Sequence, residues 1–202
     1  MAQQDRTDSL TPDSAGNLEP PPLPQELRMF SQAFPFTPMG PTSAVRELIE
    51  SHLPSWERAS YLTQTYCEQA GWLFHAVSKE QIMDELLPIY YSNGPLKATD
   101  DNKSSHEFAL LFVVFAIGAL VDLTQDPGNA EAEHYHQMAR AAICMQSVLE
   151  KPSLVTIQAL HLLSIYNAMS GNELSAKETS METTRSLIVL AAHLAHTVCL
   201  IS

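Results

Sequence analysis

Residues 131–202 read EAEHYHQMARAAICMQSVLEKPSLVTIQALHLLSIYNAMSGNELSAKETSMETTRSLIVLAAHLAHTVCLIS and hold three helical patterns, broken at residues 151–153 and 171–172. The first has apolar residues at spacings of three and four, which draw one stripe along a helix. Its members are Tyr135, Met138, Ala139, Ala142, Met145 and Leu149. The second, residues 154–169, is apolar nearly all the way round, so neighbouring helices must enclose it. It is predicted to be the central helix of a bundle.

Other helix starts are predicted from capping boxes, in which a serine or threonine precedes a glutamate or glutamine by three residues. Such pairs occur at Ser78–Gln81, Ser104–Glu107 and Thr179–Glu182. Strand signals are missing, because no run alternates apolar and polar residues and no tight hairpin turn joins two apolar segments. The sequence therefore predicts an all-α fold, an irregular helical bundle with stacked helix hairpins, over residues 43–202.

The longest uninterrupted apolar run extends from Phe108 to Val121. A helix that crosses a membrane needs about 20 such residues, so this shorter run predicts a buried helix of a protein that does not enter a membrane. Gly118 lies inside the run and costs a helix about 1 kcal/mol relative to alanine. It is therefore predicted to mark the close approach of another helix.

Residues 1–42 are rich in proline and polar residues, with prolines at 20–22, 24, 35 and 38. Such a segment buries too little apolar surface to offset the entropy lost on ordering. It is predicted to be a disordered linker, which divides the chain into residues 1–42 and a helical domain at 43–202. A proline-rich ligand for a partner domain is the alternative for this segment.

The charge and cysteine content exclude several functions. The chain of 202 residues has 11 basic and 23 acidic side chains, for a formal net charge of -12. Affinity for nucleic acid comes from basic side chains that displace counterions, so direct DNA binding is not expected. Cys67, Cys144 and Cys199 are far apart and do not form a disulfide framework. They are predicted to be reduced thiols of an intracellular protein.

Two pairs of residues have the spacing of metal ligands. Glu131 and His134 are three apart, as in half of a di-iron site, but no second Glu-x-x-His motif completes it. His136 is two residues from His134, so the two rings would not face each other on a helix. His193 and His196 are also three apart, yet they supply only half of a zinc site. No metal ligand and no cofactor-binding residue is therefore assigned.

Two further features of the sequence could serve catalysis or partner binding. Ser164 and Cys144 are the available nucleophiles, but neither lies in a Gly-x-Ser-x-Gly elbow and both fall inside apolar helical patterns. No catalytic residue is assigned, and the chain is predicted not to be an enzyme. Residues 171–184 are expected to form a loop, either a partner or effector contact or a solvated connection. Its polar members are Asn172, Glu173, Lys177 and Glu178.

An ordered set of short segments resembles the fungal-specific transcription factor domain over residues 44–202. The segments are Leu53–Pro54, Tyr66, Trp72–His75, Ala132–Tyr135, Ala139–Ala142, Pro152–Leu160, Asn172–Glu173 and Ala191–Ala195. This domain is the middle homology region of fungal zinc-cluster transcription factors. The resemblance implies a nuclear protein that regulates DNA-templated transcription through protein partners or self-association, and it is compatible with a small-molecule inducer.

The chain departs from this family in two ways. The six cysteines of the zinc cluster are absent, so no zinc ligand and no DNA-contacting residue can be assigned. Relatives also continue beyond the position of Ser202, so the last helices are expected to expose apolar faces and to associate, as in a fragment or a short paralogue. The alternative function is a stand-alone helical interaction module without enzymatic activity.

Overall fold

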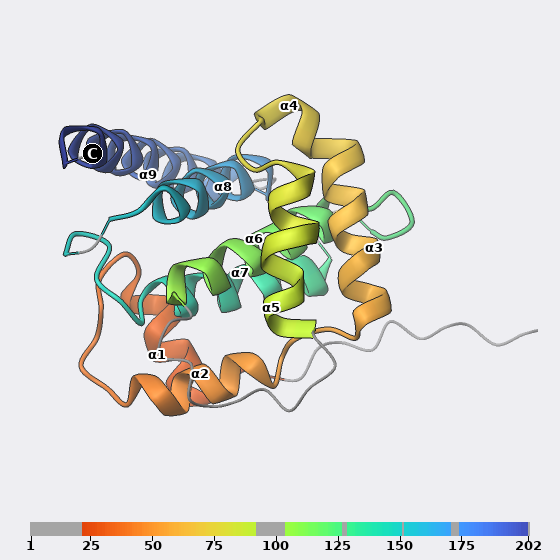
Figure 1. Cartoon of the computed structure of the whole chain (residues 1–202), viewed down its shortest axis with the longest axis horizontal. Coiled ribbons are helices and arrows are strands. Elements are labelled where there is room, and N and C mark those ends of the chain that lie inside the picture. Colours follow the sequence, from red (N-terminus) through yellow and green to blue (C-terminus); the bar gives the residue numbers. More distant parts are fainter. Residues whose placement is uncertain (1–21, 92–103, 127–128, 151, 171–173, 202) are drawn as a thin grey trace, which may run out of the picture.

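The computed structural model describes residues 22–91, 104–126, 129–150, 152–170 and 174–201, and these residues form helices and connecting turns (Figure 1). The predicted all-α class is confirmed. The helices are α1 (Gln25–Ala33), α2 (Thr42–Glu50), α3 (Trp56–Tyr66), α4 (Trp72–Phe74), α5 (Leu87–Tyr91), α6 (Ser105–Leu120), α7 (Ala130–Ile143), α8 (Leu154–Ser170) and α9 (Leu174–Ile201). Two π-helical segments, Cys67–Gly71 and Gln81–Leu86, join α3 to α4 and lead into α5.

Helix α6 is the centre of the bundle. It packs against α3, α7 and α8, and every residue from Phe108 to Ile117 is fully enclosed. The prediction that residues 154–169 form the central helix is therefore wrong. Helix α8 lies between α6 and α9 (Figure 1), and its terminal residues Leu154 and Met169 reach the surface, 64% and 36% exposed. Of the polar residues along α8, Gln158, His161 and Asn167 are partly exposed, whereas Thr156 and Ser164 are buried.

The starts of two helices follow the predicted capping. The backbone N–H of Gln81 donates to the Ser78 hydroxyl over 3.1 Å, and that of His106 donates to the Ser104 hydroxyl over 3.2 Å. Inside α6, Gly118 meets α3 so closely that an added Cβ would lie 2.3 Å from the carbonyl oxygen of Leu62. The predicted close helix approach at Gly118 is confirmed.

Helix α7 is shorter than its apolar stripe predicts. It ends at Ile143, so Met145 and Leu149 lie beyond it, and Leu149 is 61% exposed. Beyond the end of the helix, the Gln146 carbonyl accepts a 3.2 Å hydrogen bond from the His106 ring of α6. This bond holds the segment after α7 against α6.

The predicted boundary at residue 42 is also wrong. Helix α1 packs against α7, and Leu27 and Phe30 are completely buried in the common core. Their i, i+3 spacing places both on one helix face, which is enough to anchor a short helix. The prolines at 24 and 35 flank α1 and leave its interior free. The folded domain therefore includes residues 22–42, and residues 1–21 lie outside the described part of the chain.

Helix α9 packs chiefly on α8 and lies at the outside of the bundle (Figure 1). It begins at Leu174, so residues 174–184 are helical, which corrects both the predicted loop and the predicted start at Thr179–Glu182. Helix-favouring residues after Leu174 continue the helix through the capping pattern. Residues 171–173 of the predicted loop lie outside the described residues. By length and mean hydropathy (1.2), residues 181–200 reach the range of a membrane span, as core helices of soluble proteins also do.

Candidate functional site

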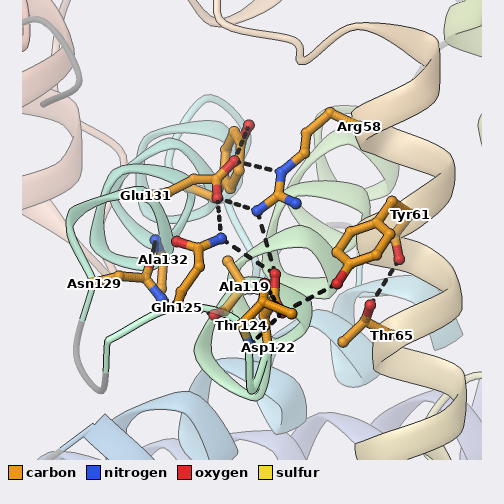
Figure 2. A network of polar contacts seen from close by, with 11 residues as sticks. Arg58, Tyr61, Thr65, Ala119, Asp122, Thr124, Gln125, Asn129, Glu131 and Ala132 are labelled. Atoms are coloured by element: carbon orange, nitrogen blue, oxygen red, sulfur yellow. Dashed lines mark hydrogen bonds and ion pairs between the residues drawn. The ribbon is translucent and has the colours of Figure 1, made fainter. Parts of the chain in front are cut away.

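A polar cluster joins α3, the turn after α6 and the first turn of α7 (Figure 2). Arg58 on α3 grips Glu131 on α7 with two hydrogen bonds, Nε to Oε1 at 3.0 Å and Nη2 to Oε2 at 2.5 Å. The same Nη2 lies 3.6 Å from Oδ2 of Asp122, whose side chain is almost fully buried. One guanidinium thus bridges two carboxylates from different parts of the chain.

The remaining acceptor positions of this cluster are occupied. Asp122 accepts hydrogen bonds from the hydroxyls of Tyr61 (3.1 Å) and Thr124 (2.7 Å) and from the Gln125 amide (3.2 Å). Burial alone would raise the pKa of Asp122, but these bonds outweigh it and hold the pKa below the ordinary value. The donors therefore keep the carboxylate charged, and the cluster has the form of a structural clamp without a free ligand position.

A second arginine lies in different surroundings. Arg140 of α7 lines a pocket of about 430 Å³ beneath the segment after α1 and beside α9. The other lining residues are Phe34, Pro35, Glu182, Thr183, Ser186, Leu187 and Leu190. The guanidinium carbon is 5.4 Å from the centre of the Phe34 ring, and Nε is buried without a hydrogen-bond partner. Desolvation lowers the pKa of Arg140, against the opposing influence of Cys144 and Glu133.

The two arginines differ in what neutralises them. Arg58 is held by Glu131 and Asp122, whereas no carboxylate of the described residues lies within ion-pair distance (4.0 Å) of Arg140. Both lie near an aromatic ring, since the Arg58 guanidinium carbon is 5.1 Å from the centre of the Tyr61 ring. The pocket at Arg140 is therefore the candidate site, because it combines an unpaired cation with open volume.

The residues with metal-ligand spacing are not brought together as a site. Glu131 is engaged by Arg58, while the ring of His134 lies 5.1 Å from that of His52. His136 faces elsewhere and stacks on Tyr166, with ring centres 4.1 Å apart. His193 and His196 are both on the exposed side of α9. Across the described ranges, no three His, Cys, Asp or Glu side chains are grouped to hold a metal ion.

The two candidate nucleophiles are both enclosed. The Ser164 hydroxyl donates to the His161 carbonyl of its own helix over 2.6 Å. Cys144, at the C-terminal end of α7, is 1% exposed, and burial raises the pKa of its thiol to about 12. A thiol with so high a pKa is not ionised near neutral pH and is a poor nucleophile. Lys177 and Glu178, predicted in a loop, lie within α9.

Sequence reasoning missed the Arg140 pocket for two reasons. Arg140 falls outside the apolar stripe of α7, which by itself indicates a solvated position. Phe34 and Pro35 lie in the segment predicted to be a linker, so no wall was expected opposite Arg140. The available signal was the spacing of Leu27 and Phe30, which would have predicted a folded segment there.

The fold and the site define a class of protein: an all-helical domain with a pocket at one buried arginine, whose described residues form no group of metal ligands. Residues 61–200 match the family described as the fungal specific transcription factor domain. This match covers more than half of the chain, so the protein belongs to that family, as its sequence resemblance predicted. No curated protein and no solved structure matches the chain.

Proposed function

We propose that this chain regulates DNA-templated transcription as the regulatory region of a fungal zinc-cluster-type transcription factor. The observation that carries the proposal is the family match over residues 61–200. The proposal includes a nuclear location and no catalytic activity, and it is supported by the family, which is non-enzymatic and whose members are in general nuclear. The proposal assigns DNA reading and zinc to a zinc-cluster module, and assigns neither to residues of this chain.

Protein contacts are the means of regulation in this proposal. A formal net charge of -12 opposes contact with the phosphate backbone of DNA. Helix α9 instead presents apolar side chains to solvent, with Ile188 and Val189 49% and 63% exposed. An apolar surface of this kind favours a protein partner or a second copy of the chain.

The test is a tethering experiment in a fungal cell. The chain is fused to an unrelated DNA-binding module, and a reporter gene carries the binding sites of that module. We expect the fusion to be nuclear and to raise or lower reporter output relative to the module alone. A matched fusion carrying Gly118→Leu, which cannot pack α6 against α3, should lose the effect. An unchanged reporter with a folded, nuclear fusion would contradict the proposal.

The second candidate function is a stand-alone helical interaction module, favoured by the exposed apolar residues of α9. Such a module would bind a partner and leave transcription unchanged when tethered to DNA. The two candidates therefore differ in the same assay. Substitution of Ile188 and Val189 by lysine would remove partner binding in both cases, but would alter the reporter only if the chain is a regulator.

A further inference from the structure

We propose that the pocket at Arg140 binds a small organic monocarboxylate with an apolar body. The pocket lies where three segments far apart in sequence meet: the end of α1, the middle of the chain at α7, and α9. Its volume of about 430 Å³ is within the range of small-molecule sites, about 300–1,000 Å³. The binding itself does not depend on the proposed function, but a regulatory effect of the ligand does.

The charge of Arg140 selects an anion. Its Nε is buried without an acceptor, and no described carboxylate is within ion-pair distance. A partly buried cation without an ion-pair partner is unfavourable, because it has lost hydration and the nearest carboxylates act on it only from a distance. A carboxylate matches the planar fork of a guanidinium and accepts two hydrogen bonds from it. Arg58 on Glu131 is a two-bond pairing of this kind within this protein, through Nε and Nη2. Because Nε of Arg140 is itself buried, a ligand in the pocket would have to pair with its two terminal nitrogens.

The walls select an apolar body. Phe34 and Pro35 form one side, and Leu187 and Leu190 of α9 form the other. Phe34 already lies over the guanidinium at 5.4 Å, so a flat ligand that pairs with Arg140 would also contact this ring. These four side chains would make the surroundings of the ion pair less polar than water, which strengthens it.

A single negative charge fits the pocket better than two. Glu182 lines the same pocket and adds a carboxylate of its own. A second anionic group on the ligand would approach this like charge, whereas a neutral polar group could bond to the hydroxyls of Thr183 or Ser186. Dicarboxylates and phosphate esters are therefore disfavoured.

The test uses the purified full chain with phenylacetate and its neutral analogue phenylacetamide, in isothermal titration calorimetry. The two probes share a body and differ in charge. We expect phenylacetate to bind at least about tenfold more tightly than phenylacetamide, as befits a hydrogen bond to a charged group. Arg140→Gln should weaken phenylacetate binding by about the same factor. Arg185→Gln, a change of an exposed arginine of α9 outside the pocket, should leave it unchanged.

A second variant keeps the test valid if Arg140→Gln fails to fold. Ser186 is exposed on α9, so Ser186→Trp should fold and fill the pocket while Arg140 is retained. We expect this variant to lose phenylacetate binding and to keep the helical circular dichroism spectrum. Equal affinity for the acid and the amide, binding unchanged by Ser186→Trp, or no heat with phenylacetate would each overturn the proposal. None of these results would alter the tethered reporter assay, so the two proposals fail separately.

Discussion

Helices α6 and α9 are both rich in apolar residues, yet they occupy opposite positions in the molecule. Fourteen of the residues in α6 are buried, including every one from Phe108 to Ile117. Of the α9 segment 181–200, only Thr184, Leu187, Ala191 and Leu194 are buried. The difference is one of neighbours, because α6 contacts α3, α7 and α8, whereas α9 packs chiefly on α8. Apolar composition alone therefore does not tell how much of a helix is buried, because this depends on the neighbouring elements.

The two helices should differ in their tolerance of added volume. An interior packed on three sides has no room for one further carbon, whereas a surface helix can extend a larger side chain into solvent. Larger side chains are thus expected to destabilise the protein when they are placed in α6 and to be tolerated on the exposed side of α9. Three experiments compare residues of the two helices, in order of decreasing effect on stability.

The largest effect is expected at Gly118. The added Cβ of Gly118→Ala would lie 2.3 Å from the Leu62 carbonyl oxygen, so the backbone of α3 or α6 must shift. In an exposed helix the same change would stabilise by about 1 kcal/mol. Here we expect the free energy of unfolding to fall by about 2 kcal/mol or more, measured by urea denaturation.

The matched change on the surface is Ala195→Leu. Ala195 is exposed on α9, so three added carbons should change the free energy of unfolding by no more than about 0.5 kcal/mol. A stable Gly118→Ala chain would mean that α3 and α6 do not cross at this glycine. A strongly destabilised Ala195→Leu chain would mean that α9 has a neighbour on this side.

The second experiment concerns pH. His106 of α6 donates from Nε2 to the Gln146 carbonyl and accepts at Nδ1 from the Thr156 hydroxyl, at 3.2 Å and 2.7 Å. This arrangement holds a neutral ring, and burial lowers its pKa below the ordinary 6.5, against the opposing backbone hydrogen bonds. Below about pH 6.5 the unfolded chain binds a proton at His106 that the folded chain does not bind. The free energy of unfolding therefore falls as the pH falls, and the neutral ring makes its full contribution to stability above that pH.

The expected result is a lower urea midpoint at about pH 5.5 than at about pH 7.5. His106→Gln should be less stable at the higher pH by about 1 kcal/mol but should show a smaller difference between the two pH values. Burial also lowers the pKa values of His134, His136 and His161. The difference in stability between the two pH values should therefore become smaller in the variant without disappearing. His193→Gln on exposed α9 is the control. An equal pH difference in the His106→Gln chain would show that this ring does not contribute.

Helix starts and the all-α class could be predicted from the sequence, because they depend on residues that are close together in the chain. The hydroxyls of Ser78 and Ser104 cap nearby backbone groups. Gly118 is unfavourable in a helix, so its presence indicated that another helix approaches closely there. The end of α7 could not be predicted, because the apolar spacing continues past Ile143, where the helix ends. Which apolar helix becomes the centre also depends on long-range packing, so the sequence predicted that α6 is buried but placed residues 154–169 at the centre instead.

The candidate site was less predictable than the fold. Arg140 on α7 differs from a solvated arginine only through Phe34 above it and α9 beside it, and these are contacts between distant segments. The same holds for Arg58, whose two carboxylate partners, Asp122 and Glu131, are far away in sequence. Residue types indicate which chemistry is available, but only the packing of α1 on α7, with α9 across the pocket, reveals which arginine is left unpaired.

The smallest effect on stability is expected on the outer face of α9, where three consecutive residues provide an internal comparison. Leu187 is 3% exposed, whereas Ile188 and Val189 are 49% and 63% exposed. Ile188→Lys with Val189→Lys should change the free energy of unfolding by less than about 1 kcal/mol in total. Leu187→Lys should lower it by several times as much, because a charge would enter the contact with α8.

Light scattering on the double variant provides the second measurement. If the outer face mediates association, the double variant should be a smaller species than the unchanged chain at the same concentration. An equal mass, with stability also unchanged, would show that Ile188 and Val189 take part in no self-contact, and the apolar face of α9 would then be available only to a different protein.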